Sequence, residues 1–138
     1  MKDKAFVDTN LLVYSYTNSD SEKHQIAKGL FQGTDTIFVI SVQVLNEFYS
    51  TLSKFKIEHD IIVSIVSEII AFCEVKSIEL QTVQTAFSLK KRYGYSYWDS
   101  LILSSALENG CKQILTEDMQ NGQVIENSLK IKNIFLSG

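Results

Sequence analysis

Three aspartates and one glutamate stand at positions in the sequence where they could form a cluster of carboxylates. Asp8 directly follows a short apolar segment, and Asp118 follows another that ends at Thr116. Asp99 lies near the start of a helical pattern, and Glu47 lies inside an earlier one. Crowded carboxylates repel one another and cannot all ionise without a compensating cation. An oxygen-only set of this kind suits Mg²⁺ or Mn²⁺ rather than zinc.

Asp99 is the most informative of these acids, because its position on its own helical pattern is unusual for a charged residue. Ile102, Leu103 and Ala106 follow it at spacings that place all four on the apolar side of a helix. The structural alternative is a capping box that begins at Ser96, in which an acid reaches back to the helix start. A carboxylate on an apolar side is costly unless it is paired or binds a cation, so we favour a functional role.

The other three acids each have an ordinary structural alternative. Asp8 could cap the helix that follows it, and Glu47 could be a solvent-facing residue of its helix. Asp118 could be a turn acid that binds its own backbone. Its neighbour Glu117 competes for any role assigned there, and the residues alone leave this choice open.

The elements that must position these acids alternate between short apolar runs and helical patterns. Apolar runs bounded by polar residues are typical of strands in a parallel sheet that is covered on both faces. We expect strands at 4–8, 37–40, 113–116 and 131–136, and helices at 10–16, 21–31, 41–55, 61–75, 83–94 and 96–110.

This alternation predicts the α/β class, with a mostly parallel four- to five-stranded sheet flanked by helices on both faces. Nothing in the sequence marks an internal boundary, so we expect one domain over residues 1–138. In such sheets, ligands bind outside the carboxyl ends of the strands. Three of the four acids fall at that edge, and Glu47 can reach it from its helix. Clustered acids with no nucleophilic side chain favour hydrolysis of a phosphodiester by metal-activated water.

The overall charge argues against a basic nucleic-acid binder that works by neutralising phosphates. The 138 residues carry 13 Lys and Arg against 16 Asp and Glu, a net charge of −3. Without the four candidate acids, 12 acidic and 13 basic residues remain, so attraction of a nucleic acid would be local and carried by the metal.

The cysteines and the apolar stretches indicate where the protein is found. The two cysteines, Cys73 and Cys111, lie in no metal-binding or disulfide pattern, which fits a reducing cytoplasm. We expect no targeting signal, because Asp8 interrupts the first apolar run. We also expect no contact with a membrane, because the longest apolar stretch is shorter than the roughly 20 residues that a spanning helix needs.

Four segments in this order resemble the PIN domain, and within it the VapC-type ribonuclease toxins of toxin–antitoxin pairs. The matching segments span nearly the whole chain and are 6–10, 44–48, 97–102 and 114–120. The resemblance implies a PIN-like parallel sheet flanked by helices. It also implies an endoribonuclease that depends on Mg²⁺ or Mn²⁺.

The resemblance also assigns roles to individual residues. It implies four catalytic and metal-binding acids: Asp8, Glu47, Asp99 and Asp118. Asp8 and Asp99 match the principal metal ligands, and Asn10 and Thr116 match polar residues that orient the carboxylates. Asp118, rather than Glu117, matches the fourth acid by analogy.

A basic segment directly before Asp99 is a candidate for RNA binding. Its cations are Lys90, Lys91 and Arg92, and their alternative role is to complement a helix C-terminus before Gly94. For the aromatic residues that follow, Tyr97 and Trp98, we favour a place in the core. Further candidates for the rim of the site are Tyr14, Tyr16 and Lys23.

The resemblance further implies two protein partners. One is a second copy of the chain, for which the apolar helix at 61–75 offers a contact surface. The other is a small antitoxin that covers the acidic site.

Two other functions remain as alternatives. The first is a housekeeping RNA-processing nuclease of the same fold. The second is a non-catalytic α/β domain that binds or signals through an acidic pocket. Receiver-type domains of that kind have adjacent acids near the start and a lysine after the last strand, and neither is evident in this sequence.

Overall fold

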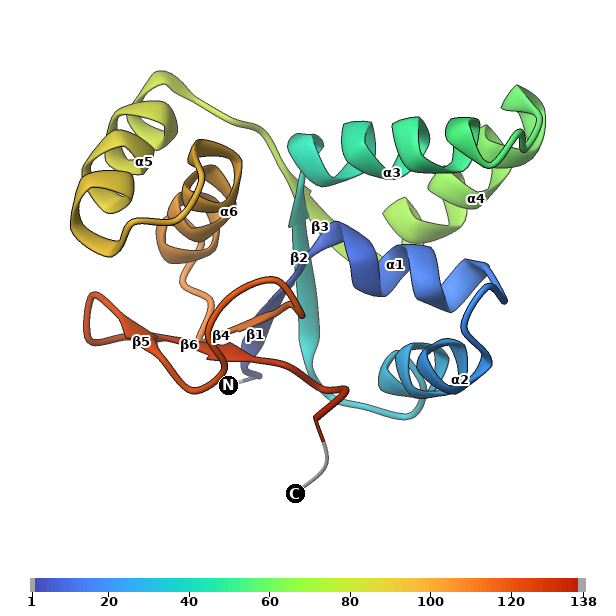
Figure 1. The fold of residues 1–138 in the computed structure, drawn as a ribbon, viewed down its shortest axis with the longest axis horizontal. Helices are drawn as coiled ribbons and strands as arrows, with labels where there is room; N and C mark the ends of the chain where they lie inside the picture. The colour runs from blue at the N-terminus through green and yellow to red at the C-terminus, as the bar shows by residue number, and fades with distance from the viewer. Residues whose placement is uncertain (1, 137–138) are drawn as a thin grey trace.

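A computed structural model, which describes residues 2–136, shows a six-stranded sheet with helices on both faces (Figure 1). The strand order is β3-β2-β1-β4-β6-β5. All neighbouring strands are parallel except β5, which pairs antiparallel with β6. The strands are β1 (Lys4–Val7), β2 (Ile37–Ser41), β3 (Cys73–Lys76), β4 (Gln113–Leu115), β5 (Val124–Ile125) and β6 (Leu129–Lys132).

Six helices within the described residues cover this sheet. Figure 1 shows α5 and α6 on one side of β1 and β2, and α1 to α4 on the other. The helices are α1 (Thr9–Tyr16), α2 (Ser21–Leu30), α3 (Val42–Lys54), α4 (His59–Phe72), α5 (Leu80–Tyr93) and α6 (Tyr97–Glu108). No helix among residues 2–136 combines the length and the hydropathy needed to cross a membrane.

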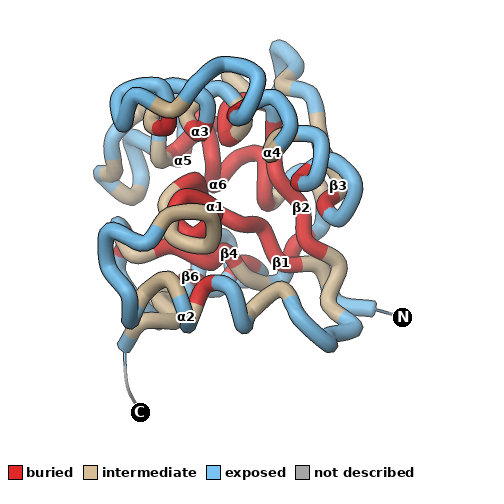
Figure 2. The backbone as a smooth tube through the Cα atoms, turned by 90° about the vertical axis from the view of Figure 1, so that its right-hand side faces the viewer, coloured by how far each residue is buried: buried red, intermediate tan, exposed pale blue. Residues whose placement is uncertain are grey.

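The core lies where β1, β2 and β4 meet the helices packed on them (Figure 2). Phe6, Val39 and Ile114, one from each of these strands, have no exposed surface. Helix α6 is buried from Leu101 to Ala106 because it packs on the sheet and also on α5. Burial on two sides explains why its sequence is apolar around most of its circumference.

The predicted fold class is confirmed, and the number of strands differs slightly from the prediction. Strand β3 occupies residues for which the sequence predicted the end of a helix, and β5 was not predicted. Strand β3 is an edge strand with the polar residues Glu74 and Lys76, and its pairing with β2 determines its conformation. Strand β6 begins at Leu129, two residues before the predicted strand at 131–136, and it ends at Lys132.

The register of β1 and β4 places two polar side chains at the same edge of the sheet. Val7 pairs with Leu115, so the next residues, Asp8 and Thr116, follow the two strand ends side by side. The Asp8 backbone N–H extends the pairing by donating to the carbonyl of Leu115 at 3.0 Å. The site is built from this edge.

Candidate active site

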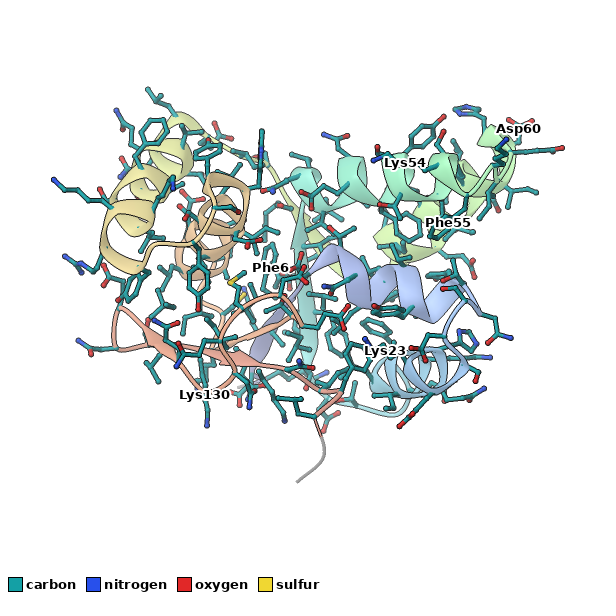
Figure 3. The ribbon with its side chains drawn as sticks, in the orientation of Figure 1. Phe6, Lys23, Lys54, Phe55, Asp60 and Lys130 are labelled. Carbon is teal, nitrogen blue, oxygen red and sulfur yellow. The ribbon has the colours of Figure 1, made fainter. Side chains whose placement is uncertain are left out.

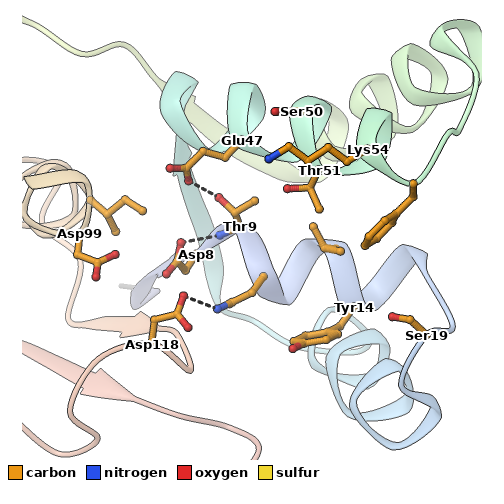
Figure 4. A pocket seen from close by; sticks show the side chains of 14 residues that line it. Asp8, Thr9, Tyr14, Ser19, Glu47, Ser50, Thr51, Lys54, Asp99 and Asp118 are labelled. Atoms are coloured by element: carbon orange, nitrogen blue, oxygen red, sulfur yellow. Dashed lines mark hydrogen bonds between the residues drawn. The ribbon is translucent and has the colours of Figure 1, made fainter. Parts of the chain in front are cut away.

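The four acids that the sequence singled out line one cleft of about 620 Å³ at the carboxyl edge of the sheet (Figure 4). Each comes from a different part of the fold. Asp8 lies between β1 and α1, Glu47 is in α3, Asp99 is in the first turn of α6, and Asp118 is in the loop after β4. The parallel sheet therefore brings together residues that are up to 110 positions apart in the sequence.

Asp8 is the most deeply buried of the four, with 4% of its surface exposed. Its Oδ1 atom accepts a 2.7 Å hydrogen bond from the backbone N–H of Thr9, and Asp8 is the N-cap of α1. Its Oδ2 atom accepts a second 2.7 Å bond from the hydroxyl of Thr116. Asp8 therefore caps α1 through Oδ1, as one interpretation of the sequence expected, and it also lines the cleft.

Burial changes the acidity of Asp8 more than its hydrogen bonds do. Loss of hydration raises the pKa of its carboxyl group from 3.8 to about 7. The bonds from Thr116 and Thr9 lower this pKa, and the negative charges of Asp118 and Asp99 raise it. At pH 7, and without a cation, the Asp8 carboxyl group is therefore protonated in about half of the molecules.

Glu47 is fixed by two residues that sequence reasoning did not single out. The hydroxyl of Thr9 donates to Glu47 Oε1 at 2.7 Å, and the amide of Gln43 donates to Glu47 Oε2 at 3.2 Å. The same Gln43 amide group donates to the carbonyl of Trp98 at 3.1 Å, which links α3 to the start of α6. Two features of the sequence could have indicated these contacts. Thr9 directly follows Asp8, and Gln43 precedes Glu47 by four residues, which places both side chains on the same side of the helix.

The predicted supporting residues Asn10 and Thr116 lie where they orient Asp118. The Asn10 side-chain amide donates to Asp118 Oδ2 at 3.0 Å. The Asp118 backbone N–H donates to the Thr116 hydroxyl at 3.1 Å, and this hydroxyl itself donates to Asp8. Thr116 thus connects two of the four acids directly.

Asp99 lines the cleft, and of the capping box considered for it from the sequence the structure forms the half that involves its backbone N–H. Its backbone N–H donates to the Ser96 hydroxyl at 3.1 Å, which caps α6. Its side chain is half-buried and lines the cleft. Burial raises the pKa of the Asp99 carboxyl group, the negative charges of Asp118 and Glu47 raise it further, and the contact with Ser96 lowers it.

Crowding also affects Asp118, although this residue is exposed to solvent. Desolvation raises the pKa of its carboxyl group, and the charges of Glu117 and Glu47 act in the same direction. The hydrogen bond from Asn10 and the charge of Lys23 lower it. The cleft as a whole therefore favours either protons or a cation among its carboxylates.

Glu117, which competed with Asp118 in the sequence, faces a different environment. Its Oε1 atom accepts a hydrogen bond from the Tyr14 hydroxyl, and its Oε2 atom is 2.7 Å from Lys23 Nζ. Glu117 is not among the residues that line the cleft, whereas Asp118 is. Of the proposed rim residues, Tyr14 lines the cleft and Lys23 is paired with Glu117.

The basic segment before Asp99 is not brought into the cleft. Lys90, Lys91 and Arg92 form the last turn of α5, which ends at Gly94 with a φ of 80°. Arg92 forms an ion pair with Glu126. None of the three cations lines the cleft, so their role in RNA binding stays a prediction.

The preferred interpretation of Trp98 as a core residue is wrong, because 61% of its surface is exposed. Tyr97 is half-buried and lies against Phe87, with the ring centroids 5.6 Å apart. In the first turn of α6, Trp98 is therefore exposed while Tyr97 and Asp99 are half-buried, and residues 100–106 are buried.

The family model of the PIN domain matches residues 5–123, and the chain belongs to this family. The matched region contains all four acids of the cleft. No protein of curated function matches the sequence.

The fold of this chain is similar to that of chains in three solved structures. VapC20 of Mycobacterium tuberculosis, a toxin that cleaves the sarcin-ricin loop, is 20% identical, with a TM-score of 0.68 over 80% of this chain and 86% of that one. A chain of VapBC2 from Rickettsia felis, bound to a DNA fragment from its promoter, is 19% identical with a TM-score of 0.67, over 94% and 99% of the two chains. A chain of DNA-bound VapBC from Salmonella typhimurium is 17% identical with a TM-score of 0.64, over 96% and 98%.

The raised pKa of Asp8 predicts how stability depends on pH in the ion-free protein. Between pH 3.8 and about 7, the folded state keeps the Asp8 proton and the unfolded state releases it. The wild-type protein should therefore lose stability as the pH rises through this range. Asp8→Asn removes this loss, so the variant should melt at a higher temperature than wild type near pH 8, with the difference closing near pH 4.

Thermal unfolding in EDTA, followed by circular dichroism across this pH range, checks this expectation. Asp35→Asn, at an exposed aspartate outside the cleft, is the matched control and should follow the wild-type curve. An Asp8→Asn variant that is less stable than wild type at pH 8 would contradict the assignment of a raised pKa to Asp8.

The contacts of Glu117 predict a second effect. Glu117→Gln removes a negative charge beside Asp118 and Tyr14, so the pKa values of the Asp118 carboxyl group and the Tyr14 hydroxyl should both fall. Carbon-13 NMR titrations of the two side chains measure both shifts. Glu126→Gln, at an exposed acid paired with Arg92, is the control and should change neither value. If the two pKa values are the same in Glu117→Gln and wild type, Glu117 is not coupled to the site.

Proposed function

We propose that this chain is a divalent-metal-dependent endoribonuclease that hydrolyses phosphodiester bonds in RNA. The observation that carries the proposal is the convergence of Asp8, Glu47, Asp99 and Asp118 on one cleft. Three of these carboxyl groups have raised pKa values, because burial and the neighbouring negative charges disfavour their ionised forms. A bound cation would offset this repulsion, and clustered carboxyl groups with shifted pKa values are typical of functional sites. Membership of the PIN family supports the same function.

The donors in the cleft fit a hard cation such as Mg²⁺ or Mn²⁺. Among residues 2–136, no three His, Cys, Asp or Glu side chains are gathered tightly enough to enclose an ion by themselves. Mg²⁺ does not need such a cage, because it usually keeps several waters and binds through one or two carboxylates. In addition, the Asn10 Oδ1 atom is buried beside the cleft without a hydrogen-bond partner among the described residues, and a neutral oxygen of this kind is a suitable ligand.

We assign the role of principal metal ligands to Asp8 and Asp99, with Glu47 and Asp118 completing the acidic set. When bound, the cation would lower the pKa of water and neutralise negative charge on the phosphate oxygens. Thr116 and the Thr9 backbone hold the Asp8 carboxylate in one orientation, and the Thr9 hydroxyl and Gln43 do the same for Glu47. Fixed carboxylates of this kind require little reorganisation when charge develops on the substrate.

We further propose that the chain is a VapC-type toxin of a toxin–antitoxin pair, in one domain over residues 1–138. The support is the structural similarity to VapC20, a toxin, and to chains of VapBC complexes. A small antitoxin would be its protein partner, and the cytoplasm its location.

A homodimer is part of the same proposal, and the surface of α4 supports it. Ile61, Val63, Ile70 and Phe72 of this helix each have at least 40% of their surface exposed. Val63 and Ile70 are seven residues apart and therefore lie on one side of α4, so a symmetric contact between two copies of this helix would remove these two side chains from water.

The proposed activity predicts that the purified protein cleaves single-stranded RNA in Mg²⁺ or Mn²⁺ and stops in EDTA. Asp99→Asn should lower the rate by more than about 100-fold, because it removes a ligand of the cation. Circular dichroism checks that the variant stays folded, and Asp35→Asn should retain full activity. Undiminished cleavage by both Asp8→Asn and Asp99→Asn would refute the assignment of the site.

Growth of cells that express the protein separates a toxin from a housekeeping nuclease. A toxin should arrest growth, Asp99→Asn should not, and co-expression of a small protein encoded next to it should relieve the arrest. Expression of the active protein without any effect on growth would contradict the toxin assignment.

A further inference from the structure

The cleft that contains the four acids continues past them along one side of α3. Glu47, Ser50, Thr51 and Lys54 all line it, at spacings of three, four and seven residues from Glu47. These spacings place the four side chains on one stripe of the helix. The opposite side of α3 packs in the core, where Leu52 has no exposed surface. The polar stripe is therefore a wall of the cleft that begins with a carboxylate and ends with an ammonium group.

Lys54 is the only Lys or Arg among the cleft-lining residues of the described chain. Within residues 2–136, no acidic side chain lies within 4.0 Å of its ammonium group. Figure 4 shows its side chain extending along α3 in the direction of Glu47. Seven residues of helix separate the two Cα atoms by roughly 10 Å along the axis. An RNA strand with its scissile phosphate at the four acids would therefore pass close to Lys54 as it continues along α3.

Phe55 follows directly and adds an aromatic face to the same part of the cleft. It caps the C-terminus of α3, lines the cleft and has 51% of its surface exposed. It does not belong to the hydrophobic core or to the partly buried residues packed against it. Exposed aromatic rings in a groove are the surfaces on which unpaired bases stack.

We propose that Lys54 and Phe55 form a subsite for single-stranded RNA, in which Lys54 binds a backbone phosphate and Phe55 stacks on an unpaired base. This inference rests on the proposed nuclease function and extends it to substrate binding. A cation, hydroxyl donors from Ser50 and Thr51, and an aromatic ring in one cleft are the combination that single-stranded nucleic acid requires. The sequence pointed instead to Lys90, Lys91 and Arg92, which lie outside the cleft.

Binding of a fluorescein-labelled, single-stranded oligoribonucleotide of mixed sequence tests the subsite. It is measured by fluorescence anisotropy in the Asp99→Asn background over a series of salt concentrations. Lys54→Gln should weaken binding and reduce the slope of log K against log salt by about 0.7, the value for one phosphate contact on a single strand. Lys54→Arg keeps the positive charge, so its affinity and its salt slope should both match those of the protein with Lys54.

Phe55→Leu should weaken binding of the single strand by about 5-fold or more and should leave binding of a duplex of the same sequence unchanged. Lys130→Gln is the matched control for Lys54→Gln. It changes an exposed lysine of β6 that lies far from Lys54 and Phe55 in Figure 3, and it should bind as the background protein does. In the active protein, Lys54→Gln should raise KM for RNA more than it lowers kcat.

Equal affinity and equal salt dependence for Lys54→Gln and Lys130→Gln would overturn the phosphate contact. Equal weakening of single-strand and duplex binding by Phe55→Leu would overturn the stacking contact. If Lys54→Gln weakens binding of a protein partner and leaves RNA binding unchanged, the surface serves that partner instead. If the protein with Asp99 intact binds RNA through both residues but does not cleave it in Mg²⁺ or Mn²⁺, the nuclease function fails and the subsite stands.

Discussion

The carboxylate of Asp8, buried at the end of β1, is the constraint on which the site depends. A buried carboxylate is costly unless it is hydrogen-bonded, and both of its oxygens accept bonds from fixed donors. One donor is the first residue of α1 and the other follows β4, so the pairing of β1 with β4 must be formed before the carboxylate is satisfied. Even so, burial raises the pKa of Asp8 to about 7, so this carboxyl group is only partly ionised in the ion-free protein at neutral pH.

The other acids are held by extensions of this arrangement. Thr116 links Asp8 to the Asp118 backbone, and Thr9, whose backbone N–H donates to Asp8, holds Glu47 through its hydroxyl. Gln43 then connects Glu47 to the start of the helix that carries Asp99. The carboxylates of Asp8, Glu47 and Asp118 therefore belong to one hydrogen-bonded frame at the carboxyl edge of the sheet, and Gln43 joins the backbone at the start of α6 to this frame. A frame of this kind fits a site in which a cation, and not a nucleophilic side chain, does the chemistry.

Much of the fold and of the acidic set could be predicted, because both depend on local patterns. Short apolar runs predicted β1, β2 and β4, and the position of Asp99 on an apolar helix side indicated that it was not an ordinary surface residue. Strand β3 could not be predicted, since its polar residues form a strand only through pairing with β2. The roles of Thr9 and Gln43 depend on contacts between elements distant in the sequence, as does the separation of Glu117 from Asp118. The exposure of Trp98 and the place of Lys54 in the cleft likewise follow from how α3 and α6 are set on the sheet.

We propose that a divalent cation replaces a proton held among the four acids. Calorimetric titration of Mn²⁺ into the ion-free protein, repeated in buffers of different ionisation enthalpy, counts the protons released for each ion bound. With the pKa of Asp8 at about 7, the wild-type protein should release about half a proton per ion at pH 7 from this group. Asp8→Asn should bind Mn²⁺ more weakly and lose this release. Binding of Mn²⁺ with no proton release by the wild-type protein, or equal affinity and release in Asp8→Asn, would contradict this exchange of a proton for a cation at Asp8.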